Sequence, residues 1–267
     1  MVKLSCPEVI SPIKYASHML FFRFFETEMA TNYALSKKFV ISAGSYPLYY
    51  YVKGRARSSQ DKAKFHNVHK NFYPNDFDLW TNLENIGQVV EVLVQFLNRN
   101  QDLKAIGIQI TGGKNKYRRS MSVPQICGII SFRLVTKRSN EASIPIQVIC
   151  WDDEHDHHIS CKKDLLLSVV EHFDISICKV GWLSGANLEE IMIYDKQVML
   201  DIKEKQFTIK FKRFENMEAV QKRLTKYIQR GFALREIIFP LGLSLQDVNH
   251  RFVANVRNVS DNEMDEA

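Results

Sequence analysis

The sequence Val40-Ile41-Ser42-Ala43-Gly44-Ser45, together with Asn75-Asp76-Phe77-Asp78-Leu79-Trp80, decides which fold this chain can form. The first stretch is an apolar run that ends in two small residues, which predicts a buried strand and a tight turn. The second stretch places an acidic residue on each side of Phe77. Because successive side chains of a strand point to opposite faces, a strand here puts both carboxylates on one face and Phe77 in the core.

Two carboxylates on one face repel each other, so a cation between them is favoured. Hard oxygen ligands of this kind suit Mg²⁺ or Mn²⁺, which keep open positions for substrate phosphates. We therefore predict that Asp76 and Asp78 bind magnesium or manganese and carry any catalysis. The alternative is a polar turn that enters a strand after Pro74.

The Gly44-Ser45 turn predicts a phosphate site. Gly44 lets the backbone approach phosphate oxygens without a Cβ clash. Ser45 can cap the helix that follows, with Pro47 in its first turn and Gly54 at its end. Since the N-terminus of a helix presents N–H groups to an anion, Gly44 and Ser45 are the candidate nucleotide-binding residues.

The order of these two stretches, followed by a helix, resembles the nucleotidyltransferase-fold (polymerase-β-like) proteins of large DNA viruses and fungi. A later stretch, from Arg223 to Phe232, resembles the closing helix of that group, and the likeness spans residues 38–235. The resemblance implies an α/β (α+β) fold with a nucleotidyltransferase-like mixed sheet and flanking helices. It also implies Mg²⁺ at Asp76 and Asp78 and a nucleotide near Gly44 and Ser45.

The chain departs from that family in two respects. Ser45 and Asp76 are 31 positions apart, so an insert must loop out between them. The family also places a third carboxylate on a later strand, where the best candidate strand here, residues 143–150, has Gln147 at its centre. An amide cannot act as a general base and is a poor ligand for Mg²⁺. Substitutes for the missing carboxylate are Asp152, Asp153 and Asp174.

Composition and charge restrict the class of partner. The net charge is +6, which favours an anionic partner such as nucleotide, RNA or DNA over a merely soluble surface. No run approaches the ~20 apolar residues that span a bilayer, and we expect no secretory signal. The five cysteines are Cys6, Cys127, Cys150, Cys161 and Cys178. Their odd number and scatter predict no disulfide framework and an intracellular setting, cytoplasmic, nuclear or virion-associated.

We expect three segments: an N-terminal helical segment over 1–37, a nucleotidyltransferase-like domain over 38–257, and a disordered acidic tail over 258–267. The domain contains a basic insert, residues 53–70, with six basic residues and one acidic residue. The insert is either an arm that holds a triphosphate or nucleic-acid backbone, or a solvated loop.

Periodicity predicts the remaining elements. Helices are expected over 13–35, 82–98, 161–173, from about 187, and over 217–231, with a turn at 181–186. Strands are expected over 105–111 and 125–136 as a hairpin, and over 143–151, 174–180 and 207–211. On the last helix, Lys222, Lys226 and Arg230 are spaced at i, i+4 and i+8. Facing the nucleotide, Lys222 and Lys226 would bind the triphosphate, whereas facing water they form a solvated stripe.

Three functions follow. The first is Mg²⁺-dependent transfer of a nucleotide from a nucleoside triphosphate to an acceptor, with Asp76 and Asp78 at the metal. The second is a catalytically inactive relative that binds nucleotide or nucleic acid, which Gln147 favours. The third is a basic nucleic-acid-binding or structural virion protein.

Overall fold

The computed structural model describes residues 24, 40–55, 72, 74–99, 103–112, 125–136, 145–152, 159–183, 191–210 and 217–239. Apart from Phe24, the predicted N-terminal helical segment lies outside the described residues, as does nearly all of the basic insert. So do the tip of the predicted hairpin, residue Asp153 and the acidic tail.

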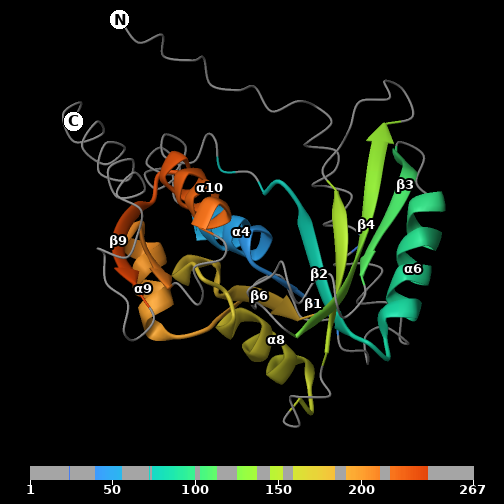
Figure 1. Cartoon of the computed structure of the whole chain (residues 1–267), viewed down its shortest axis with the longest axis horizontal. Coiled ribbons are helices and arrows are strands. Elements are labelled where there is room, and N and C mark those ends of the chain that lie inside the picture. The colour runs from blue at the N-terminus through green and yellow to red at the C-terminus, as the bar shows by residue number, and fades with distance from the viewer. Residues whose placement is uncertain are drawn as a thin grey trace, which may run out of the picture.

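A seven-stranded mixed sheet forms the centre of the molecule (Figure 1). Its strands, in spatial order, are β3 (Leu103–Gly112), β4 (Ile126–Thr136), β5 (Ile146–Trp151), β2 (Phe77–Asn82), β1 (Val40–Ala43), β6 (Val180–Leu183) and β7 (Met192–Ile193). The pair β2–β5 is parallel, and the other neighbouring pairs are antiparallel. A parallel pair needs a long crossover, and helix α6 (Ile86–Arg99) with the β3–β4 hairpin supplies it.

Helices cover both faces of the sheet because its central strands are apolar on both sides. Helix α6 packs over one face, where Val89, Leu93 and Leu97 meet Leu79 and other buried side chains. Helix α8 (Lys162–Glu171) packs over the other face (Figure 1). Its side chains Leu165, Leu166, Val169 and Val170 contact a cluster that contains Ile41, Ala43, Trp80 and Trp151.

A second packing unit holds the C-terminal part of the described chain. Strands β8 (Gln206–Lys210) and β9 (Ala233–Ile238) pair in parallel. They pack with helices α9 (Lys196–Glu204), α10 (Met217–Gln229) and α4 (Ser45–Arg55), and with the 3₁₀ turn η2 (Ser176–Cys178). Helices α4 and α10 contribute to one core cluster, in which Leu48 and Val52 of α4 join Leu224 and Ile228 of α10. The helix that follows the glycine turn therefore packs with the basic helix.

A buried polar network ties this unit together. Asp201 has no exposed surface and accepts hydrogen bonds from Ser176 Oγ at 2.7 Å and from Arg235 Nη1 at 2.5 Å. Arg235 also donates to Thr208 Oγ1 at 3.0 Å. The carboxylate thus links η2, α9, β8 and β9, since buried charge is stable only when it is paired and hydrogen-bonded.

The α/β class and the mixed sheet with flanking helices are confirmed, as is the order strand, Gly-Ser, helix, strand with the paired aspartates. The predicted hairpin, the helices over 82–98, 161–173 and 217–231, and the strands over 143–151 and 207–211 also form, with shifted ends. Helix α4 ends at Arg55, one residue beyond the predicted Gly54.

Three predictions between residues 174 and 195 are wrong. The predicted strand over 174–180 has the 3₁₀ turn η2 at its centre and reaches a strand, β6, only at Val180. The predicted turn at 181–186 begins as that strand. The helix predicted from about residue 187 begins at Lys196, after strand β7. Asp195 determines that start, because its side chain caps α9 by accepting a hydrogen bond from the Val198 N–H.

In the described part of the chain, no helix is both long and apolar enough to cross a bilayer.

A substitution at Gly181 would test how closely α8 packs on the sheet. A Cβ at Gly181 would lie 2.8 Å from the Ser42 carbonyl oxygen and 2.3 Å from Leu166 Cδ1. We expect Gly181→Ala to lower the free energy of unfolding by about 1–3 kcal/mol, because the added methyl overpacks the interface. The measurement is urea denaturation followed by far-ultraviolet circular dichroism.

Gly87 is the matched control, since a Cβ there would meet nothing within 4 Å. Gly87→Ala, in helix α6, should leave stability unchanged or raise it by up to about 1 kcal/mol. Equal stability losses in both variants would contradict this account of the α8 interface.

Candidate functional site

The glycine turn between β1 and α4 is fixed by backbone contacts. Gly44 has φ = 100°, a left-handed conformation that glycine adopts without strain. Its N–H donates to the Val180 carbonyl at 3.0 Å, and its carbonyl accepts from the Leu48 N–H at 3.2 Å. Gly44, rather than Ser45, therefore provides the first carbonyl of helix α4, and Ser45 is its first residue.

This geometry limits which backbone groups could contact a phosphate, and the nucleotide contacts of Gly44 and Ser45 stay a prediction. The Gly44 N–H is used by β6, so it is not available to an anion. Pro47 has no N–H, which leaves the first turn of α4 with fewer donors than an ordinary helix. Ser45, at the N-terminus and half-buried, is the position that offers both a backbone N–H and a hydroxyl.

The two aspartates lie at the start of β2. Phe77 and Leu79 are buried in the core under α6, and Trp80 is buried under α8. Strand alternation therefore puts Asp78 on the face of Trp80, with Asp76 just before the strand begins. The strand therefore places Asp78 as predicted, whereas Asp76 lies outside the strand, and its position on the same face stays a prediction.

Asp78 is half-buried, and its carboxyl group is largely shielded from water. Its Oδ1 atom is buried and has no hydrogen-bond partner among the described residues. Burial raises the pKa of the Asp78 carboxyl well above its usual range, and the negative charge of Asp76 raises it further. Lys226 acts in the opposite direction. The position therefore favours an additional positive charge close to Asp78.

The glycine turn and the aspartates lie on adjacent strands. In the β1–β2 pair, Ser42 lies opposite Leu79 and Ile41 opposite Trp80. The next step of this antiparallel register puts Ala43 opposite Asp78, so that Gly44 and Ser45 leave β1 at the end where β2 begins. The structure thus brings together two stretches that the basic insert separates in the sequence.

Helix α10 supplies positive charge to the aspartates. Lys226 feels the charge of both Asp76 and Asp78, and burial, with a contribution from Arg230, lowers the pKa of its ammonium group. Arg230 is only 4% exposed and also feels the charge of Asp76. Its guanidinium lies 4.7 Å from the ring centroid of Phe72 and 5.1 Å from that of Tyr227. Arg230 is therefore a buried cation that compensates the charge of Asp76, and it is not part of a solvated stripe.

Beneath these cations, Cys178 Sγ donates to Tyr227 Oη at 2.8 Å. Burial raises the pKa of the Cys178 thiol to about 11, which keeps it protonated. An ion pair between Arg223 Nη2 and Asp174 Oδ2, at 2.6 Å, ties the same helix to the segment before η2. Sequence reasoning did not identify these contacts, which fix the position of α10.

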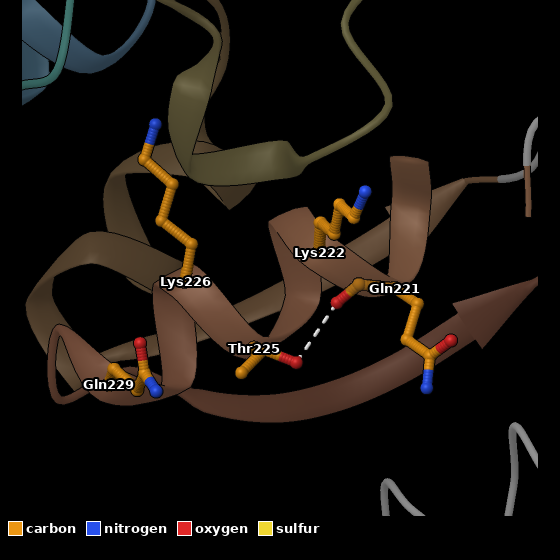
Figure 2. A pocket seen from close by; sticks show the side chains of 5 residues that line it. All are labelled: Gln221, Lys222, Thr225, Lys226 and Gln229. Atoms are coloured by element: carbon orange, nitrogen blue, oxygen red, sulfur yellow. Dashed lines mark hydrogen bonds between the residues drawn. The ribbon is translucent and has the colours of Figure 1, made fainter. Parts of the chain in front are cut away.

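One face of α10 lines a pocket of about 330 Å³, built from Gln221, Lys222, Thr225, Lys226 and Gln229. Figure 2 shows the side chains of Lys222 and Lys226 extending to the same side of the helix. Thr225 Oγ1 donates to the Gln221 carbonyl at 3.0 Å. Lys222 is exposed, whereas Lys226 is partly buried and feels the charge of both aspartates, so the two predicted lysines have different surroundings.

Gln147 lies beside Asp78. The two residues are register partners in the parallel β2–β5 pair, and Ser131 of β4 is the next partner in the same row. Asp152 lies at the opposite end of β5, and Asp174 is paired with Arg223. No group of three or more potential His, Cys, Asp or Glu ligands occurs among the residues the structure describes.

The oxygen atoms of Asp76 and Asp78 fit a divalent cation. Two carboxylates, one with a buried oxygen that lacks a partner, fit a hard cation whose other positions are filled by water or phosphate oxygens. They do not make a three-carboxylate site, because the neighbouring position is an amide.

The raised pKa of Asp78 gives a pH prediction. A proton held more tightly by the folded state stabilises it below the ordinary pKa of 3.8, and that stability is lost as pH rises through the raised pKa. Asp78→Asn should therefore unfold at a higher temperature than the wild type at pH 7, and the difference should vanish near pH 3.

Asp164 is the control with the opposite sign. Hydrogen bonds, the largest from the Ser160 side chain, lower its pKa to about 2. Asp164→Asn should lose stability at pH 7, and its deficit should disappear as pH falls from about 4 to 2. If Asp78→Asn behaves like Asp164→Asn, Asp78 is not desolvated as described.

Comparisons with known proteins give a partial likeness. No model of a known protein family matches the chain, and no curated protein sequence matches it. A solved structure described as the complex of a CCA-adding enzyme with CTP aligns with 82% of this chain, at 10% identity and a TM-score of 0.44. The chain spans 43% of that protein's length.

Proposed function

We propose that this chain is a nucleotidyltransferase-like protein that binds a nucleoside triphosphate together with Mg²⁺ or Mn²⁺ and transfers a nucleotide to an acceptor. The observation that carries the proposal is the desolvated Asp78 carboxyl, adjacent to Asp76 and Lys226 and next to the glycine turn. Such a site favours a cation, and a nucleoside triphosphate brings Mg²⁺ or Mn²⁺ with it, bound to its phosphate oxygens.

Each group has a role in this proposal. Asp76 and Asp78 would hold the cation, which would polarise phosphate oxygens and stabilise the leaving pyrophosphate. Ser45, at the N-terminus of α4, would donate to a terminal phosphate. Lys226 would shift its interaction from the aspartates to the triphosphate, while the exposed Lys222 would contact the outer phosphates from the same face of α10. Arg230, held by Phe72 and Tyr227, would remain the fixed counter-charge.

A binding protein without turnover is the second candidate. The observation in its favour is the register of Gln147 with Asp78, since the amide gives that row no third carboxylate and no base. Such a protein would bind nucleotide or nucleic acid through the basic surface, as a nucleic-acid-binding or virion scaffold. The net charge of +6 is compatible with that role.

The first experiment measures binding and transfer with the full chain. ATP with Mg²⁺ should bind in isothermal titration calorimetry, and Asp78→Ala should abolish the dependence of that binding on Mg²⁺. With Mn²⁺ and α-labelled nucleoside triphosphates, label should enter an RNA oligonucleotide or the protein itself. Asp76→Ala and Asp78→Ala should each reduce incorporation at least about 100-fold, because charge stabilisation at the transition state is lost.

Matched controls separate local from general effects. Lys226→Ala should weaken ATP binding, whereas Lys163→Ala, an exposed lysine on α8, should not. ATP binding that is insensitive to chelator and to Asp78→Ala would overturn the proposed cation site. Chelator-sensitive binding without incorporation would leave the second candidate in place of the first.

Gln147 allows the two candidates to be compared directly. Gln147→Asp places a third carboxylate in the row with Asp78, so transfer with Mn²⁺ should rise by about 10-fold or more if its absence limits the reaction. Gln147→Asn is the control, since it changes length but adds no charge. A folded Gln147→Asp variant that binds more Mn²⁺ without faster transfer would show that the amide is not what limits turnover.

A further inference from the structure

Two cysteines that are 23 positions apart in the sequence meet where β4 bulges against β5. Ile126 lies opposite Trp151, and Gly128 lies opposite Cys150, with the register shifting between them. Cys127 is therefore the extra residue of a β-bulge. Ile126 and Ile129 both belong to the core cluster under α8. The bulge between these two residues lies opposite Cys150.

The bulge places the two sulfurs in contact. Cys127 Sγ lies 2.9 Å from Cys150 Sγ and 3.4 Å from the Cys150 carbonyl oxygen. The S–S bond of a disulfide is about 2.0 Å long, so the two sulfurs are already close to bonding distance. The remaining approach of the two sulfurs is under about 1 Å, which side-chain rotation can supply.

We propose that Cys127 and Cys150 form a peroxide-sensitive thiol pair that closes to an intramolecular disulfide between β4 and β5. The proposal is independent of nucleotide binding, since it rests on a different part of the sheet. It adds an oxidative modification site to a chain whose cysteine spacing predicts no disulfide.

The difference in exposure assigns the two roles. Cys127 is partly exposed, whereas Cys150 is 1% exposed. The Cys127 thiolate attacks one peroxide oxygen, the O–O bond breaks, and a sulfenic acid forms with loss of hydroxide, which takes up a proton to become water. Cys150 sulfur then attacks the sulfenic sulfur, the S–O bond breaks, and the hydroxyl leaves as water with the Cys150 proton. Two thiols and one hydrogen peroxide thus give one disulfide and two waters.

Two other cysteines of the described chain provide internal comparisons. Cys178 is buried, and the burial that raises its pKa to about 11 protects it from oxidation. Cys161 is exposed at the start of α8, so peroxide can reach it. A reaction governed by exposure alone would modify Cys161, whereas a reaction governed by proximity links Cys127 to Cys150.

The test treats the reduced full chain with hydrogen peroxide, blocks remaining thiols with iodoacetamide, and maps non-reduced peptides by mass spectrometry. We expect a peptide pair joined through Cys127 and Cys150, about 2 Da lighter than the sum of the two reduced peptides. Dithiothreitol should restore both thiols. Cys127→Ser and Cys150→Ser should each abolish the linked pair, whereas Cys161→Ser should retain it.

Cys127→Ala provides a second test if a serine disturbs the bulge. In that variant, Cys150 should remain alkylatable only after unfolding. The proposal is overturned if the folded wild type acquires oxygen at Cys161 while the Cys127 and Cys150 peptides stay unlinked. It is also overturned if the link forms only between two chains.

Discussion

The desolvated carboxyl of Asp78 is the constraint on which the candidate site depends. A buried carboxylate is costly, and a second carboxylate beside it makes ionisation still less favourable. The arrangement persists because Lys226 and Arg230 of α10 supply compensating charge from one side. Without that helix, the two aspartates would lie uncompensated at the start of a central strand of a packed sheet. The position of α10 is therefore as much a part of the site as the strand itself.

Contacts from several elements hold helix α10 in place. The Cys178–Tyr227 hydrogen bond and the Arg223–Asp174 ion pair fix α10 against η2 and the segment before it. The core cluster shared by α4 and α10 connects the helix that begins at the glycine turn to the helix that carries the cations. A ligand that bound both the N-terminus of α4 and Lys226 would consequently bind to one continuous packing unit.

Sequence reasoning recovered the parts of the fold that repeat a local pattern. Short windows of sequence encode the apolar stripe of α6 and the alternation in the β3–β4 hairpin. They also encode, separately, the turn at Gly44 and the start of the strand that carries Asp78. It failed at residues 174–180, where an alternating apolar segment reads as a strand. There a tertiary contact determines the local structure. The Ser176 hydroxyl donates a hydrogen bond to the buried Asp201 carboxylate and accepts one from the Thr208 N–H. The Cys127–Cys150 contact depends on a bulge, which no spacing in the sequence reveals.

Gln147, which deprives the proposed reaction of a third carboxylate, also keeps the charge of the candidate site balanced. Asp76 and Asp78 are balanced by Lys226 and Arg230, so a third carboxylate at position 147 would leave the empty site with excess negative charge at a buried position. Gln147 avoids that excess and still presents a polar amide in the same row. A triphosphate that arrives with its own Mg²⁺ would then need only two carboxylates, since its phosphate oxygens complete the coordination. On this reasoning the amide is compatible with tight nucleotide binding, and its effect falls on the step that requires a base.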